Sequence, residues 1–170
     1  MTKVIAPVVT TIDNFSQLSP NKFKVVINLF PDTSFWAQRV VLPTITLGQN
    51  LVPTNKSIRW TTPGDTLEYD DLIISFIVDE DMIGYRKIKK WQEDTVNRER
   101  PDERFSDMQI LLLTNNSNKN LSFKFKNTYP YLISTVLMDT TQAEDQPLTV
   151  DVNFKHSHFD IDPPIDPIII

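Results

Sequence analysis

The sequence predicts an α+β domain that is mostly β: a β-sandwich or flattened barrel of at least six strands with one flanking amphipathic helix. Two patterns carry this prediction. Several segments alternate apolar and polar residues with a period of two, which is typical of strands that bury one face. Residues 80–97 instead repeat their apolar residues every three positions, as an amphipathic helix does. A chain of 170 residues is long enough to bury such a core in one domain.

The composition excludes several classes of function. The chain has 17 Lys and Arg against 22 Asp and Glu, and the formal charge of −5 disfavours general binding to nucleic acid. Without cysteine there is no disulfide framework, thiolate nucleophile or sulfur-based zinc site. The three glycines, Gly48, Gly64 and Gly84, form neither a dinucleotide fingerprint nor a P-loop. No apolar run approaches the ~20 residues of a membrane span, and residues 1–14 carry no recognisable secretion signal, so we expect no membrane segment.

The first part of the chain predicts an arm and two strands. Residues 1–16 show no firm period, and we expect an N-terminal arm that needs a neighbour to become ordered. Residues 23–29 alternate apolar and polar side chains, which predicts a strand with one buried face. Residues 35–42 predict a second strand, and the apolar run at its end leads us to expect that this strand is covered on both faces.

Residues 43–66 form an unusual segment, because prolines punctuate it at regular intervals while Ile58 and Trp60 alternate with polar neighbours. A structureless loop of this length would be unexpected inside a compact domain. We therefore expect an extended excursion that pairs with itself and reaches another chain.

A central strand and the helix come next. Residues 72–78 are the most apolar stretch of the chain and predict a strand covered on both faces. The acidic residues 79–81 end this strand and cap a helix, which we place at 80–97. The helix residues expected to pack on the sheet are spaced three apart: Met82, Tyr85, Ile88 and Trp91.

The remaining segments predict further strands and a tail. Residues 108–113 and 121–126 indicate a hairpin around an Asn-rich turn, a short strand follows at 132–138, and residues 148–155 alternate clearly. Residues 161–170 are rich in proline and end in three isoleucines. Such an apolar tail suggests docking on a partner.

No catalytic, cofactor-binding or metal-binding constellation emerges, and we expect no enzyme and no cofactor. The acidic groups at 69–71 and 79–81 are explained by turns and capping. His156 and His158 have a zinc-ligand spacing but no evident third ligand. A basic cluster falls within the predicted helix, where we expect it to favour the negative helix end as a solvated face: Arg86, Lys87, Lys89 and Lys90. A metal-dependent hydrolase that uses the acids or histidines is the alternative from another class.

An ordered series of short motifs gives a further indication. It comprises Leu42-Pro43, Pro63-Gly64-Asp65, Tyr69-Asp70-Asp71-Leu72, the strand 73–78, Asp79-Glu80-Asp81, a helix that closes on Trp91-Gln92, Tyr129-Pro130, Leu132-Ile133-Ser134 and the strand 150–159. In this order the motifs resemble the tail tube protein family of contractile-tailed bacteriophages, over about residues 20–161. Both ends extend beyond the usual compact limits of that family.

The resemblance implies a division of the chain into an arm at 1–16, a tail-tube-like β domain at 17–160 and an apolar tail at 161–170. It also implies a structural subunit that forms stacked hexameric rings in the virion tail, assembled in the host cytoplasm. The implied partners are further copies of the chain, the tail sheath protein and a baseplate or tube initiator, while genomic DNA passes through the lumen without specific binding. Residues 43–66 would reach the next ring, and the candidates for that contact are Pro53, Ile58 and Trp60.

Two alternatives share the same fold. The long ends leave open a tube-initiator or baseplate paralogue in place of the major tube subunit. A ring protein of a type VI secretion system is the second alternative.

Overall fold

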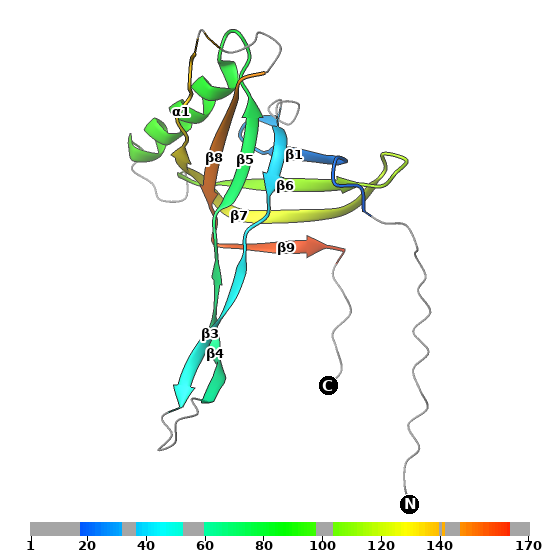
Figure 1. Ribbon diagram of the computed structural model, residues 1–170, viewed down its shortest axis with the longest axis vertical. Coiled ribbons are helices and arrows are strands. Elements are labelled where there is room, and N and C mark those ends of the chain that lie inside the picture. The colour runs from blue at the N-terminus through cyan, green and yellow to red at the C-terminus, as the bar shows by residue number, and fades with distance from the viewer. Residues whose placement is uncertain are drawn as a thin grey trace, which may run out of the picture.

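The computed structural model describes residues 18–31, 37–52, 60–97, 104–139, 141 and 147–163. Their fold confirms the predicted class, α+β and mostly β (Figure 1). The elements, in chain order, are β1 (Phe23–Ile27), β2 (Ala37–Val41), β3 (Ile45–Val52), β4 (Trp60–Tyr69), β5 (Leu72–Ile77), α1 (Ile83–Asn97), β6 (Ser106–Leu113), β7 (Lys119–Ile133), β8 (Thr149–Lys155) and β9 (His158–Asp162).

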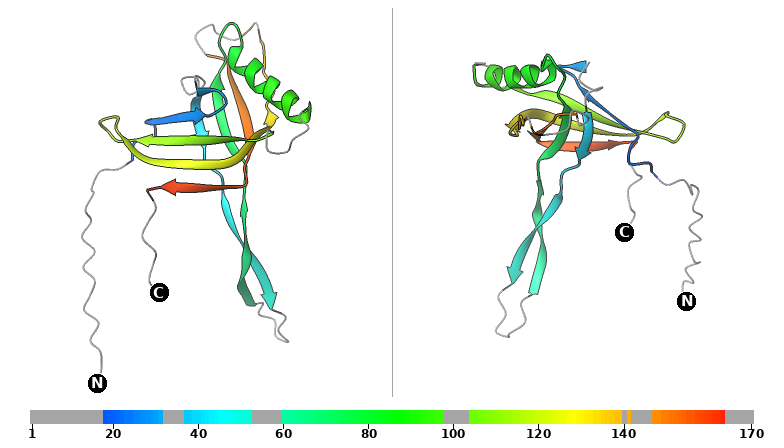
Figure 2. Two further views of the ribbon diagram at one scale, coloured as in Figure 1. Left: turned by 180° about the vertical axis from the view of Figure 1, so that it is seen from behind. Right: turned by 45° about the horizontal axis from the view of Figure 1, so that its top comes forward.

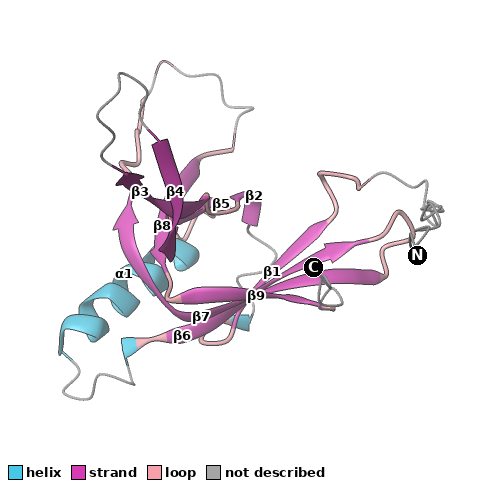
Figure 3. Cartoon of the chain, turned by 90° about the horizontal axis from the view of Figure 1, so that it is seen from below, coloured by secondary structure: helices cyan, strands magenta, loops and turns pink. Residues whose placement is uncertain are grey.

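Seven of these strands form one antiparallel sheet that bends at β7. The strand order is β1-β6-β7-β8-β5-β2, and β9 pairs with the outer side of β7. The long β7 belongs to two layers, because its residues up to 128 pair with β6 and β9 whereas residues 129–133 pair with β8. Figure 3 shows the resulting four-stranded layer of β1, β6, β7 and β9 running away from the other strands. Among the described residues the sheet does not close into a barrel, since β1 and β2 at its two ends do not pair.

The core lies inside this bend, and α1 covers it. The alternating residues of β1, β5, β6, β7 and β8 supply most of the buried side chains, including Phe125 and Phe154 at 0% exposure. From α1, Ile88 and Trp91 enter the core, and the Trp91 ring lies 6.0 Å from that of Phe154. Tyr85 packs on the edge of the core as well.

The helix begins later than expected. Asp79 accepts a hydrogen bond from the amide of Ile83 at 2.9 Å, so the first of the three acids provides the cap. Met82 precedes the helix with a φ of 51° and lies outside the buried cluster, unlike the other three residues predicted to pack on the sheet.

Three strand predictions differ from the structure. β2 is an edge strand whose Val41 is 36% exposed, so it is not covered on both faces. The predicted short strand at 132–138 is wrong, because β7 continues through Pro130 to Ile133 and residues 134–139 form no strand. The predicted strand at 148–155 corresponds to β8, but the strand 150–159 expected from the family motifs is broken at His156 and Ser157 into β8 and β9, which pair with different parts of β7.

Candidate functional site

The β3–β4 hairpin, residues 45–52 and 60–69, projects away from the sheets as a long two-stranded arm (Figures 1 and 2). It forms a sheet of its own that is not joined to the seven-stranded sheet. A two-stranded hairpin has little stability alone in water, because it has no second layer on which to bury its side chains. The arm therefore gains little stability from packing within the described part of the subunit.

The hairpin exposes an unusual amount of apolar surface. The exposed large apolar side chains on its two strands are Ile45 (53%), Leu47 (47%), Leu51 (66%), Val52 (42%), Trp60 (68%) and Leu67 (57%). Single exposed apolar residues are ordinary, but a group of this size on one element is typical of a protein–protein contact.

The strand register sorts these residues onto two faces. Ile45 lies opposite Tyr69 and Leu47 opposite Leu67, so both pairs share one face of the inner half. Thr46 and Glu68 form the intervening pair on the opposite, polar face. At the outer end, Val52 lies opposite Trp60. The half of the arm near the body thus has one apolar and one polar face. The outer end of the described strands carries the apolar pair Val52 and Trp60.

Two of the three glycines allow the hairpin strands to cross closely. The register shifts between Leu47 and Gln49, beside Gly48. A Cβ atom on Gly64 would lie 2.7 Å from the carbonyl oxygen of Gly48, and one on Gly48 would lie 2.6 Å from Oγ1 of Thr66. The first of these contacts is with backbone, which cannot move aside as a side chain can. The close crossing visible in Figure 1 therefore requires glycine at position 64.

An aromatic cluster holds the root of the hairpin. The Tyr69 ring lies 5.5 Å from that of Phe159, and the Phe125 ring lies 5.1 Å from that of His156. Both ring nitrogens of His156 are buried here without a hydrogen-bond partner. This burial lowers the pKa of His156, an effect that Asp71 opposes and that Lys155 and His158 reinforce. The histidine is therefore held neutral as part of an apolar root.

Asp71, at the end of the hairpin, has a structural partner. It forms an ion pair with Lys155 of β8 at 2.5 Å and accepts a hydrogen bond from the Asn153 amide at 3.3 Å. The ion pair raises the pKa of Lys155. These contacts join the start of β5 to β8 and explain the acid without a bound ion.

The four-stranded layer presents two open edges. β1 and β9 are its outer strands, and the described residues supply no strand to pair with the far side of either. Each has five residues. Three successive antiparallel pairings, β1 with β6, β6 with β7 and β7 with β9, connect the two outer strands, so β1 and β9 run in opposite directions. Such unpaired edges readily add a strand from another chain.

The face of this layer opposite the core is polar and charged. Lys124 forms an ion pair with Asp162 at 3.0 Å, and Lys126 forms one with Asp107 at 2.6 Å. The hydrogen bond from Lys124 lowers the pKa of Asp162, and the hydrogen bond to Asp107 raises the pKa of Lys126. Positive and negative groups on this face thus pair with each other.

The predicted site residues fall in different places. Trp60 stands at the outer end of β4, while Pro53 and Ile58 lie outside the described residues. His156 and His158 do not share a strand face, since the chain turns between them and His158 is exposed beside the Ser157 hydroxyl at 3.0 Å. In the part of the chain that the structure describes, no group of three His, Asp or Glu side chains is placed to hold a metal ion. No helix there has the length and apolarity to cross a membrane.

Sequence reasoning missed most of the exposed apolar hairpin residues. Ile45, Leu47 and Leu51 alternate with polar residues and Gly48 in the printed sequence. This period-two signal predicts a strand with one covered face, as it does elsewhere in the chain. It does not reveal that these side chains are exposed in the described chain.

Comparison with known proteins gives one family and several structures of the same fold. A family model described as phage tail tube protein matches residues 7–162. A chain of the anti-feeding prophage baseplate has a TM-score of 0.66 at 12% identity, covering 86% of this chain and 95% of that one. A chain of the extended sheath–tube complex of an extracellular contractile injection system has a TM-score of 0.61 at 11% identity, with coverages of 86% and 91%. A chain of the anti-feeding prophage cap has a TM-score of 0.65 at 14% identity, with coverages of 93% and 99%. No curated protein matches the chain.

Proposed function

This chain belongs to the phage tail tube protein family, and we propose that it is the subunit of the hollow inner tube of a contractile bacteriophage tail. Hexameric rings of the chain stack into a tube in the virion, and the genome passes through the lumen. The subunit acts by assembly and contributes no catalytic step. Its partners are further copies of itself, the surrounding tail sheath protein and a baseplate or initiator on which the tube begins.

The single observation that carries this proposal is the pair of open edges on the four-stranded layer. In a ring, the β9 edge of one subunit meets the β1 edge of the next. Rotation about the ring axis leaves the direction of each strand along that axis unchanged. β9 of one subunit and β1 of the next therefore run in opposite directions, so their junction is antiparallel like every pairing within the layer. An even number of strands per subunit lets the alternation continue around the whole ring. Closure then removes both exposed edges, which would otherwise pair without control.

The polar face of the same layer suits a lumen. The core-facing residues of the layer are buried against α1 and the other strands, so the opposite face is the one left to line the bore. Lysines on that face would attract a polyphosphate if they were unpaired. Ion pairing of Lys124 and Lys126 with carboxylates reduces that attraction and allows DNA to slide.

The β3–β4 hairpin provides the stacking contact between rings. It extends beyond the body of the subunit (Figure 2), and its large apolar side chains are between 42% and 68% exposed in the described chain. Burial of these side chains on the neighbouring ring supplies the apolar contact that a free hairpin lacks. Trp60 is the anchor of this contact, with Pro53 and Ile58 as further candidates in the segment beyond β3.

A tube-initiator or tube-terminating subunit is the second candidate. It is favoured by the fold shared with a baseplate chain and a cap chain, whose TM-scores match or exceed that of the sheath–tube chain. Such a subunit would form one ring and would not polymerise alone. A type VI secretion ring protein remains a further alternative, which the genomic neighbours of the coding sequence distinguish.

Negative-stain electron microscopy of the purified protein at rising concentration tests the proposal. Long hollow tubes with six-fold end views support the major tube subunit. Single rings that do not elongate support the initiator or terminator, and monomers at every concentration contradict both.

A further inference from the structure

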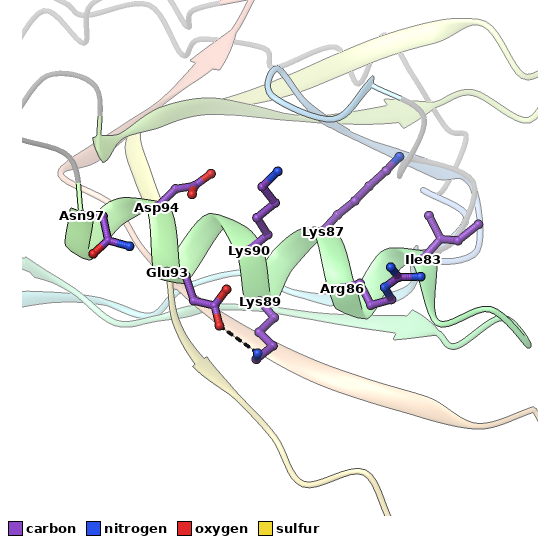
Figure 4. A pocket seen from close by; sticks show the side chains of 8 residues that line it. All are labelled: Ile83, Arg86, Lys87, Lys89, Lys90, Glu93, Asp94 and Asn97. Carbon is purple, nitrogen blue, oxygen red and sulfur yellow. Dashed lines mark ion pairs between the residues drawn. The ribbon is translucent and has the colours of Figure 1, made fainter.

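The outward surface of α1 borders a hollow and carries more basic than acidic side chains. The described residues that line a hollow of about 620 Å³ all belong to this helix: Ile83, Arg86, Lys87, Lys89, Lys90, Glu93, Asp94 and Asn97. Figure 4 shows Lys87, Lys90 and Asp94 pointing to one side of the helix and Lys89 and Glu93 to the other. We call these eight residues the α1 surface.

A second hollow beside the helix adds an apolar floor. It measures about 280 Å³ and lies between α1 and the turn after β1, lined by Leu29, Phe30, Lys87, Lys90, Trp91 and Asp94. Leu29 is 41% exposed, and the Phe30 ring lies edge-on to Trp91 at 6.0 Å. The Nζ atom of Lys87 lies 5.9 Å from the centre of the Phe30 ring. Cationic groups thus rim an aromatic and aliphatic surface.

The charges of α1 run against its own dipole. The prediction that the basic cluster lies near the negative helix end is wrong, because the helix continues to Asn97 and the cluster occupies its first half. α1 has no acidic residue in its first turn and no basic residue in its last, whereas a helix is stabilised by the reverse arrangement. In its ion pair, Lys89 with Glu93 at 2.8 Å, the basic residue precedes the acidic one, which stabilises a helix less than the opposite order does. Charged residues that do not stabilise their own helix are expected at functional surfaces, such as a binding site.

Two of the cations are left for a partner. Arg86 and Lys90 are exposed and form no ion pair with any described residue. They lie four residues apart and so project from neighbouring turns of α1.

We propose that the α1 surface, together with Leu29 and Phe30 of the second hollow, docks an acidic, partly apolar segment of another protein. Carboxylates of that segment pair with Arg86 and Lys90, and its apolar side chains cover Leu29 and the Phe30 edge. The apolar floor and the overall charge of −5 favour a protein segment over a nucleic acid, which would need a longer basic track. This docking does not depend on the ring arrangement, because every residue involved belongs to one subunit.

The test measures binding of a fluorescent peptide of about 15 residues, with Leu and Glu at helical spacing, to the full-length protein by anisotropy. The same peptide with Gln in place of Glu and a single-stranded oligonucleotide of about 12 nucleotides serve as competing probes. The double variant Arg86→Gln with Lys90→Gln is compared with the double variant Lys22→Gln with Lys119→Gln. The second removes the same charge beside the turn between β6 and β7 instead of from α1.

We expect the Glu peptide to bind best, and the α1 pair of changes to weaken it about tenfold or more while the control pair changes the affinity less than about twofold. Leu29→Ser weakens the same peptide. Removal of cations from the positive half of the helix leaves the melting temperature unchanged or raised, so a loss of binding is not a loss of folding. Equal binding of the Gln peptide or the oligonucleotide, or full binding by the Arg86 and Lys90 variant, would overturn the proposal.

Discussion

Trp60→Ala should weaken stacking of rings far more than it weakens the subunit. Trp60 is 68% exposed, so its side chain adds little to the single chain but has most of its surface left to bury. A tryptophan side chain offers roughly 200 Å². About two thirds of that area, at ~25 cal/mol per Å², corresponds to roughly 3 kcal/mol of stacking free energy per subunit. Because ~1.4 kcal/mol is a factor of ten, the critical concentration for tube growth should rise about a hundredfold.

The assay compares two quantities for the same variant. The critical concentration is measured by sedimentation and electron microscopy, and the melting temperature is measured on dilute, unassembled protein. We expect the melting temperature to change by less than about 2 °C, as for most exposed positions. Val96→Ala, which truncates an exposed apolar residue of α1, serves as the control and should alter neither quantity. If Trp60→Ala lowers tube length and melting temperature together, Trp60 supports the fold and the assignment of the hairpin to stacking is wrong.

Three further predictions follow from the hairpin, its root and the charged face. Gly64→Ala places a Cβ 2.7 Å from the Gly48 carbonyl oxygen, so it should abolish long tubes while near-ultraviolet circular dichroism of the core persists; normal tubes would show that the crossing is dispensable. His156→Phe removes two unpartnered buried nitrogens and should stabilise the fold by about 1–2 kcal/mol in urea unfolding. Burial lowers the pKa of His156 in the folded chain below its ordinary value of 6.5. As the pH falls through 6.5, the unfolded chain therefore binds more protons than the folded chain, and the wild type should lose stability. The His156→Phe variant should lose less stability over the same pH range. Equal pH dependence in both proteins would show that His156 is not the responsive group. Asp162→Asn with Asp107→Asn unpairs lysines of the charged face and should increase retention of single-stranded DNA by assembled tubes, whereas Asp139→Asn, outside that face, should not; equal retention in all tubes would place this face away from the lumen.

The sequence predicted the parts of the fold whose period is set by burial within the subunit. β1, β5 and β8 alternate or run apolar because the core covers them, and the spacing of Ile88 and Trp91 fits a helix laid on that core. The arrangement of strands was not predictable, because pairing partners such as β1 with β6 depend on contacts between distant residues.

The misreadings share a physical cause. Val41 and Leu42 are as apolar as core residues, so the pattern predicted a covered strand, yet they are exposed beside the root of the hairpin. Hydrophobic patterns report burial without saying whether the cover is the same chain or another one. The break at His156 and Ser157 does leave a signal, because the apolar positions are even up to Phe154 and odd from Phe159 onward, a change of register that the strand prediction overlooked.

The site was predictable only in part. Prolines and alternation in 43–66 indicated a hairpin that reaches outward, and Trp60 was identified within it. The contribution of Leu47, Leu51 and Leu67 became evident only from their exposure. The position of the basic cluster relative to the helix dipole was predicted wrongly. It depends on where α1 begins and ends, because these bounds decide which end of the dipole the lysines occupy.

Cysteine cross-linking across the proposed junction tests the ring arrangement most directly. Lys24→Cys on β1 is combined with Asp160→Cys or, for the neighbouring register, Asp162→Cys on β9, because these positions lie on the same face of the layer. In assembled protein, oxidation of one of the two combinations should give a covalent ladder on denaturing gels that ends at six chains, while each single variant stays monomeric or dimeric. Tubes that form normally but yield no ladder with either combination would contradict the junction between β9 and β1.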